Sequence, residues 1–135
     1  MIRVRPTAPV VRVVVLLTAA TGAFVRSLGY VNPPTSKATS FIDGLLPITA
    51  WAVIWAVAGV VALAGLWHRS LAKWALNIIA ALWFTWMLSY IVATTTGDFS
   101  RGWLTAGGFF VIAAYTWTFA YLIDRPGRAG EPWNG

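Results

Sequence analysis

Hydrophobic positions dominate the centre of the chain, where two long uncharged runs lie on either side of one short basic turn. The runs cover residues 48–67 and 74–94, and the turn covers residues 68–73. About 20 consecutive apolar residues form a helix long enough to cross a hydrocarbon core of ~30 Å. Because so short a turn joins the two runs, they predict an antiparallel hairpin of membrane-spanning helices.

One further apolar run lies on each side of this hairpin, at residues 9–28 and 103–123. The first is the weakest of the four, since only residues 13–25 are free of charge. We therefore expect Arg12 and Arg26 to extend toward the nearer membrane interface. The pattern as a whole predicts an all-α membrane protein, with the entire chain forming one antiparallel bundle of four transmembrane helices.

The basic residues predict how this bundle is oriented, because cytoplasmic loops carry an excess of Lys and Arg. With the N-terminus inside, the cytoplasmic side holds seven basic residues: Arg3, Arg5, Arg12, Arg69, Lys73, Arg125 and Arg128. The other side holds three: Arg26, Lys37 and Arg101. This bias predicts that both termini are cytoplasmic. Residues 124–135 are rich in Gly and Pro, which predicts a disordered tail.

Composition agrees with a membrane protein. The chain is 59% hydrophobic and 10% charged, whereas about a quarter of the residues in a soluble domain are charged. A net charge of +6 would suggest nucleic-acid binding in a soluble protein, but here the basic residues lie at the ends of apolar runs. We therefore expect no nucleic-acid partner. The absence of cysteine excludes disulfides and thiolate metal sites.

Several residues near the ends of the predicted spans are typical of interfacial anchors. Tryptophan is enriched at both membrane–water interfaces, and long basic side chains extend to them. The predicted anchors are Arg12, Arg26, Arg69, Lys73, Trp67, Trp74 and Trp103.

Small and weakly polar residues form candidate packing faces, because helices approach closely in lipid through such residues. In the third run Asn77, Ala81, Thr85 and Ser89 recur every four residues. The second run offers Ala58, Ala62 and Gly65 on one face. We expect these two faces to pack against each other, the alternative being a water-lined pore face. The remaining candidates for assembly are Gly22 in the first run and Gly107 and Ala114 in the fourth.

Titratable residues suggest little chemistry. All four acids, Asp43, Asp98, Asp124 and Glu131, fall in predicted loops or in the tail. No predicted span therefore carries the embedded acid that a proton-coupled exporter needs. His68 is the only histidine, and no nucleophile lies beside a base. We expect no enzymatic activity, no cofactor and no metal site.

The overall layout resembles a group of small phage proteins. Residues 3–6 read Arg-Val-Arg-Pro, and a Val- and Leu-rich helix, three Trp-rich spans and a short basic tail follow. This layout is similar to that of small four-span membrane proteins of actinobacterial phages, several of which are holins or lysis-cassette proteins. The resemblance implies a holin-like protein that self-associates and permeabilises the bacterial inner membrane. Alternatives are a non-pore interaction protein, acting in superinfection exclusion or as an accessory subunit, and a small channel or transporter. The implied partners are the lipid bilayer and either further copies of the chain or another membrane protein.

Overall fold

The computed structural model describes residues 9–31, 42, 45–98 and 100–124. Within them the chain forms four α-helices and no strand: α1 (Pro9–Gly29), α3 (Ile48–Ala64), α4 (Arg69–Thr95) and α5 (Gly102–Asp124). Helices α1, α4 and α5 are long and apolar enough to cross a membrane, whereas α3 has 17 residues and is shorter. The prediction of an all-helical chain with apolar, membrane-compatible helices is confirmed for these residues. The predicted disordered tail lies outside the described residues, apart from Asp124, which ends α5.

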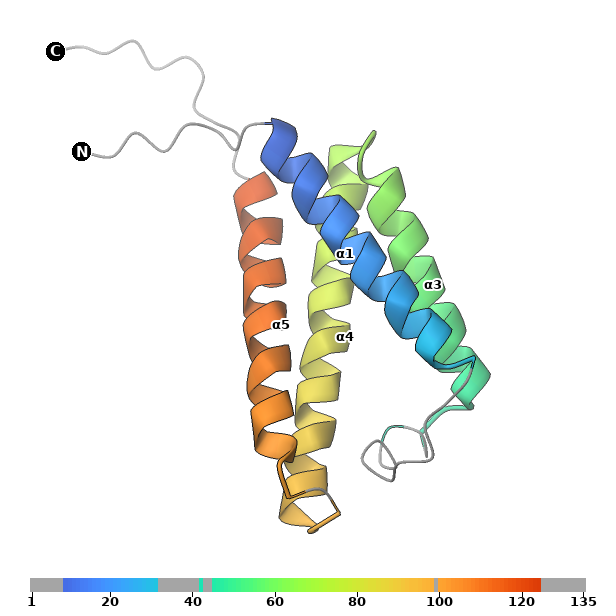
Figure 1. The fold of residues 1–135 in the computed structure, drawn as a ribbon. Coiled ribbons are helices and arrows are strands. Elements are labelled where there is room, and N and C mark those ends of the chain that lie inside the picture. The colour runs from blue at the N-terminus through green and yellow to red at the C-terminus, as the bar shows by residue number, and fades with distance from the viewer. Residues whose placement is uncertain (1–8, 32–41, 43–44, 99, 125–135) are drawn as a thin grey trace, which may run out of the picture.

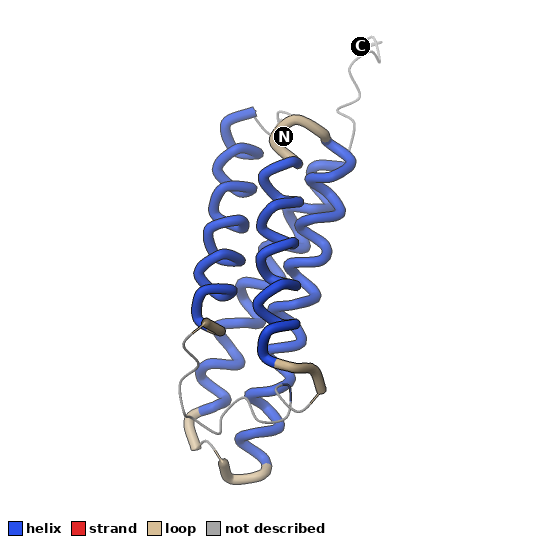
Figure 2. Tube along the Cα trace, turned by 90° about the vertical axis from the view of Figure 1, so that its right-hand side faces the viewer, coloured by secondary structure: helices blue, strands red, loops and turns tan. Residues whose placement is uncertain are grey.

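Consecutive helices run in opposite directions, so that the start of α1 and the end of α5 lie at the same end of the molecule (Figure 1). The tube view shows the helices along one long direction, with the connecting turns at its two ends (Figure 2). The most extensive contacts join α4 to α5 and α1 to α3. The central hairpin of α3 and α4 meets most closely at its own turn, and its helices separate toward the other end (Figure 1).

The central hairpin differs from the predicted spans in where its helices end. Helix α3 stops at Ala64 rather than at residue 67, and Gly65 follows as its C-terminal cap, with its N–H donating to the Val61 carbonyl. Helix α4 begins at Arg69 and so includes most of the basic turn that we expected to separate the helices. Hydropathy reports which residues prefer lipid, whereas a helix can begin among charged residues if its backbone bonds form.

The residues between α3 and α4 are small where the two helices are close and large where they separate. At the turn, a Cβ placed on Gly65 would lie only 2.7 Å from the Cα of Ala72, so these backbones nearly touch. Farther from the turn, the space between the diverging helices is filled by buried indole rings from Trp51, Trp55 and Trp86. Small residues where helices approach and large rings where they separate together give a continuous core.

Helix α1 also packs along α3 with a large side chain against a small residue. The ring of Phe24 lies 3.0 Å from the position of a Cβ on Gly59, so a larger residue there would require the ring to shift by a few tenths of an ångström. The Ser27 hydroxyl donates a hydrogen bond of 2.8 Å to the Ala52 carbonyl, which joins the two helices directly.

The outer surface of the bundle is apolar. Large hydrophobic side chains are exposed on all four helices, including Val53 and Val57 of α3, Phe84 of α4 and Trp117 of α5. Soluble monomers rarely expose apolar patches larger than a few hundred Å². A surface of this kind is suited to contact with lipid acyl chains.

Candidate functional site

The α3 face that we expected to pack is buried. Ala58, Ala62 and Gly65 are all buried, and the two alanines belong to a core cluster that also contains Ala75 and Ile79 of α4. The α3 residues identified from spacing therefore lie where a helix–helix contact is made.

The α4 stripe expected to meet this face lies elsewhere. Asn77 and Ala81 line an open groove of about 480 Å³ between α4 and α5, and Ala81 is exposed. Only Ser89, at the far end of the stripe, is buried. A helix turns 100° per residue, so each step of four residues rotates the stripe by about 40°, and three steps rotate it by about 120°. The stripe thus winds around α4 instead of staying on one face.

The polar groups of this stripe also bond within their own helix. The Asn77 amide donates to the Lys73 carbonyl at 3.0 Å, and the Thr85 hydroxyl donates to the Ala81 carbonyl at 2.9 Å. These two side chains therefore bond within α4 and not to another helix.

The remaining assembly candidates have different surroundings. A Cβ on Gly22 would lie 3.8 Å from the Trp83 ring, at the edge of a groove of about 520 Å³ between α1, α4 and α5. Ala114 is half-buried in the α4–α5 groove. Gly107 and the adjacent Gly108 are exposed, and nothing lies within 4 Å of a Cβ placed on either. The unpartnered small-residue face is therefore on α5.

Arg12 caps a neighbouring helix, and its expected extension toward the membrane interface stays a prediction. Its guanidinium Nη2 donates to the Gly65 carbonyl at 2.8 Å and to the Leu66 carbonyl at 3.0 Å. The last carbonyls of a helix have no partner within that helix and carry a partial negative charge. Arg12 of α1 therefore neutralises the C-terminus of α3.

Arg69 does the same for α5. Its Nε donates to the Ile123 carbonyl at 2.8 Å, and its Nη2 donates to the same oxygen. Two arginines at one end of the bundle thus each bond to the C-terminus of another helix, a role that spacing along the sequence does not reveal.

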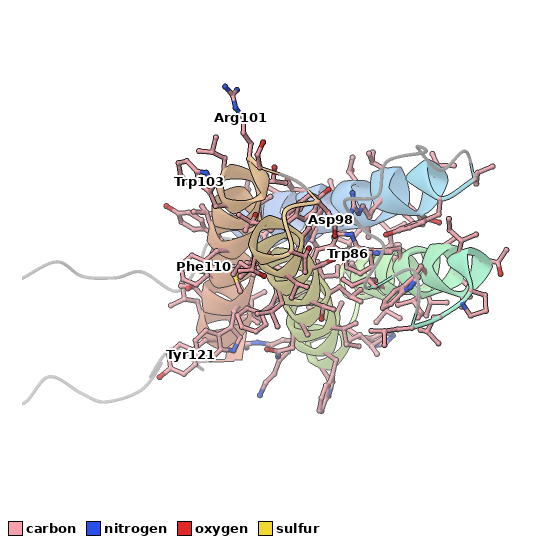
Figure 3. The ribbon with its side chains drawn as sticks, turned by 90° about the horizontal axis from the view of Figure 1, so that it is seen from below. Trp86, Asp98, Arg101, Trp103, Phe110 and Tyr121 are labelled. Atoms are coloured by element: carbon pink, nitrogen blue, oxygen red, sulfur yellow. The ribbon has the colours of Figure 1, made fainter. Side chains whose placement is uncertain are left out.

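The other predicted anchors lie at or near helix ends, and their interfacial role stays a prediction. Trp67, Trp74 and Trp103 are 76%, 63% and 61% exposed. Lys73 is half-buried in the first turns of α4. Figure 3 shows Trp103 on the outside of α5, close to its start.

Arg26, near the C-terminal end of α1, lies against aromatic rings. Its Cζ is 5.1 Å from the ring centroid of Trp86, 5.7 Å from that of Phe109 and 5.8 Å from that of Tyr30. A guanidinium over an aromatic face gains from cation–π attraction, which strengthens away from water. The structure packs this side chain against rings just after α1 and on α4 and α5, and its expected extension to the membrane interface stays a prediction.

This aromatic cluster contains four buried polar atoms with no hydrogen-bond partner: Arg26 Nε, Trp55 Nε1, Trp86 Nε1 and Ser89 Oγ. Trp86 lies among α1, α3 and α4, whereas Arg101 projects away from the helices (Figure 3). Buried polar groups are nearly always paired, so four orphans in one cluster call for an explanation.

In the ranges that the structure describes, no three His, Cys, Asp or Glu side chains come close enough to hold a metal ion. Comparison with protein-family models, with curated proteins and with solved structures finds no match to this chain.

Proposed function

We propose that this chain is a small, holin-like integral membrane protein of phage type, which self-associates and permeabilises the bacterial inner membrane. The observation that carries the proposal is the exposed glycine pair of α5. Gly107 and Gly108 face outward with nothing within 4 Å of an added Cβ, so the backbone of a second helix can approach there.

The apolar exterior supports the membrane location. Three helices are long and apolar enough to cross, and α3 adds a shorter apolar helix of 17 residues, about 25 Å long at 1.5 Å per residue. In the proposed topology all four helices span the membrane, because the lower limit for a spanning helix is about 17 residues. Both termini are cytoplasmic, which places Arg12, Arg69 and Lys73 on the side favoured for basic residues.

Lateral assembly follows from lipid physics. Lipid tails are as apolar as leucine, so helices in a membrane associate through close packing rather than through a hydrophobic driving force. Ala114 lies seven residues after Gly107, two turns farther along α5, and extends the small-residue face toward the middle of the helix. Contacts between copies along this face would build the assembly that perturbs the bilayer.

The test substitutes Gly107 with leucine, which places a large side chain between two approaching backbones. We expect self-association in liposomes, measured by energy transfer between labelled copies, to weaken at least tenfold, and loss of membrane potential in expressing bacteria to be delayed. The matched control is Val57→Leu on α3, which also enlarges an exposed apolar side chain. It should leave both measurements unchanged.

Two results would reject the proposal: wild-type protein that stays monomeric in bilayers, or wild-type protein that accumulates in cells without loss of potential. Normal association of Gly107→Leu would reject the α5 face alone. A protein that accumulates harmlessly and co-purifies with one host membrane protein would instead be an interaction protein, acting in superinfection exclusion or as an accessory subunit through the same unpartnered face.

A further inference from the structure

One of the four unpartnered polar atoms is the Nε1 of Trp86, and the other three belong to residues around its indole. The Trp55 ring centroid is 5.6 Å from that of Trp86, and the Arg26 guanidinium carbon is 5.1 Å from it. Ser89 follows Trp86 by three residues on α4, which places both on neighbouring positions of the same helix face. The orphans thus belong to one place in the core, where α1, α3 and α4 meet.

The chemistry of this place is one-sided. A guanidinium and an indole N–H can only donate hydrogen bonds, and only the Ser89 hydroxyl can also accept one. The residues packed around them supply aromatic rings: Trp51 contacts Trp86 at 4.8 Å between centroids, in an edge-to-face arrangement. Among the described residues, the cluster therefore combines one positive charge with several N–H donors, and Arg26 Nε and the two indole N–H groups bond to no acceptor.

The described residues also give Arg26 no carboxylate partner. The carboxylate of Asp98 is exposed in the turn after α4, where it accepts a hydrogen bond of 2.7 Å from Thr96. It does not neutralise Arg26. Arg26 is half-buried, and its buried Nε has no partner, which is costly because a charged donor is removed from water without a compensating bond.

We infer that Arg26, Trp55, Trp86 and Ser89 form a binding site for a phosphate-type oxyanion. Several acceptor oxygens on one negatively charged group would satisfy the guanidinium and the indole donors together, and charge-assisted bonds of this kind are the stronger ones. Arg26 is half-buried and lies three residues before the end of α1, so the site lies toward the bundle end opposite to the start of α1 (Figure 1). Either free phosphate or the phosphate of a lipid headgroup can supply this chemistry.

The experiment measures binding to the full-length protein in an uncharged maltoside detergent. One arm titrates inorganic phosphate, with sodium gluconate keeping the ionic strength constant. The other arm adds phosphatidylglycerol to the micelles, with an uncharged glycolipid as reference. We expect a saturable change in tryptophan fluorescence and a rise in melting temperature, because a ligand that binds only the folded state stabilises it. A response to phosphatidylglycerol alone identifies the lipid headgroup as the source.

Variants separate the site from general effects of charge. Arg26→Gln should abolish the response, whereas Arg101→Gln removes an exposed arginine and should leave it intact. Since Arg26→Gln can also weaken the aromatic core, Trp55→Phe provides a second variant, which keeps an aromatic ring at this position but removes the indole N–H. We expect it to weaken binding about tenfold, which corresponds to about 1.4 kcal/mol.

No saturable response in either arm would overturn the inference, as would a wild-type response in Arg26→Gln. Unchanged affinity in Trp55→Phe would also contradict the assigned donors. The cluster would then be a closed cation–aromatic core whose N–H groups face neighbouring rings.

Discussion

Replacing Gly65 with alanine tests the close contact at the turn of the central hairpin. Gly65 has φ −62° and ψ −15°, a conformation open to any residue, so alanine introduces no backbone strain. In open surroundings the substitution would even be favourable, since alanine exceeds glycine in helix propensity by about 1 kcal/mol. The new Cβ, however, would lie 2.7 Å from the Cα and 2.9 Å from the N of Ala72.

The size of the effect follows from these distances. Non-bonded carbon atoms pack at roughly 3.5–4.0 Å, so the two helices must separate by about 1 Å. Both contacted atoms belong to the α4 backbone, which cannot swing away as a side chain can. Overpacking of this kind typically costs about 1–3 kcal/mol.

The same displacement affects Arg12. Its guanidinium bonds to the carbonyls of Gly65 and Leu66, at 2.8 and 3.0 Å, and a shift of about 1 Å would break at least one of these bonds. Hydrogen bonds that involve a charged group contribute about 1.5–3 kcal/mol. We therefore expect Gly65→Ala to lower the free energy of unfolding by about 2 kcal/mol or more.

Unfolding can be followed by far-UV circular dichroism while dodecyl sulfate is added to maltoside micelles. The matched control is Gly108→Ala, within α5, with nothing within 4 Å of the new Cβ. It should be unchanged or more stable by up to about 1 kcal/mol, the difference in helix propensity. If Gly65→Ala proved as stable as Gly108→Ala, the backbone contact between α3 and α4 would be wrong.

Two further predictions use the same unfolding measurement. Ala75→Leu, at a fully buried position, should lower the free energy of unfolding by about 1–3 kcal/mol through overpacking. Ala81→Leu, at an exposed position on the same helix, should change it by less than about 0.5 kcal/mol. Equal losses would support the packing face that we first expected from the sequence. Arg12→Gln should lower the free energy of unfolding by about 1.5–3 kcal/mol because it removes a charged donor from the end of α3. Arg101→Gln, at the exposed surface, should have little effect. Unchanged stability of Arg12→Gln would contradict the capping role.

The four helices were predictable because each apolar run is long, and nothing but a helix fits such a run in lipid. Their ends were less predictable. Hydropathy placed the end of the second span at residue 67, whereas the helix ends at Ala64, where Gly65 caps it. It also assigned Arg69 to a turn, although Arg69 is the first residue of α4. A scale that measures preference for lipid does not register where backbone hydrogen bonds stop.

The packing faces show a second limit. On α3 the spacing of Ala58 and Ala62 identified a buried face, because positions four residues apart stay together over one turn. On α4 the same rule was applied over three turns, from Asn77 to Ser89, and the accumulated rotation carried the stripe off the contact. Small residues at fixed spacing identify a face locally, and the partner of that face depends on the crossing angle of the helices.

Arg12 and Arg69 connect the proposed membrane orientation of the chain to the stability of its helix ends. In an antiparallel four-helix chain with cytoplasmic termini, the second and fourth helices both end on the cytoplasmic side. The positive-inside rule places basic residues on that same side. Helix C-termini with unsatisfied carbonyls and long basic side chains are thus brought together by topology alone. Arg12 bonds to the end of α3, 53 residues farther along the chain, and Arg69 bonds to the end of α5, 54 residues farther along. Because these carbonyls border the low-dielectric part of the bundle, each bond is worth more than an exposed salt bridge. In the proposed topology, the residues that orient the chain therefore also close its helix ends.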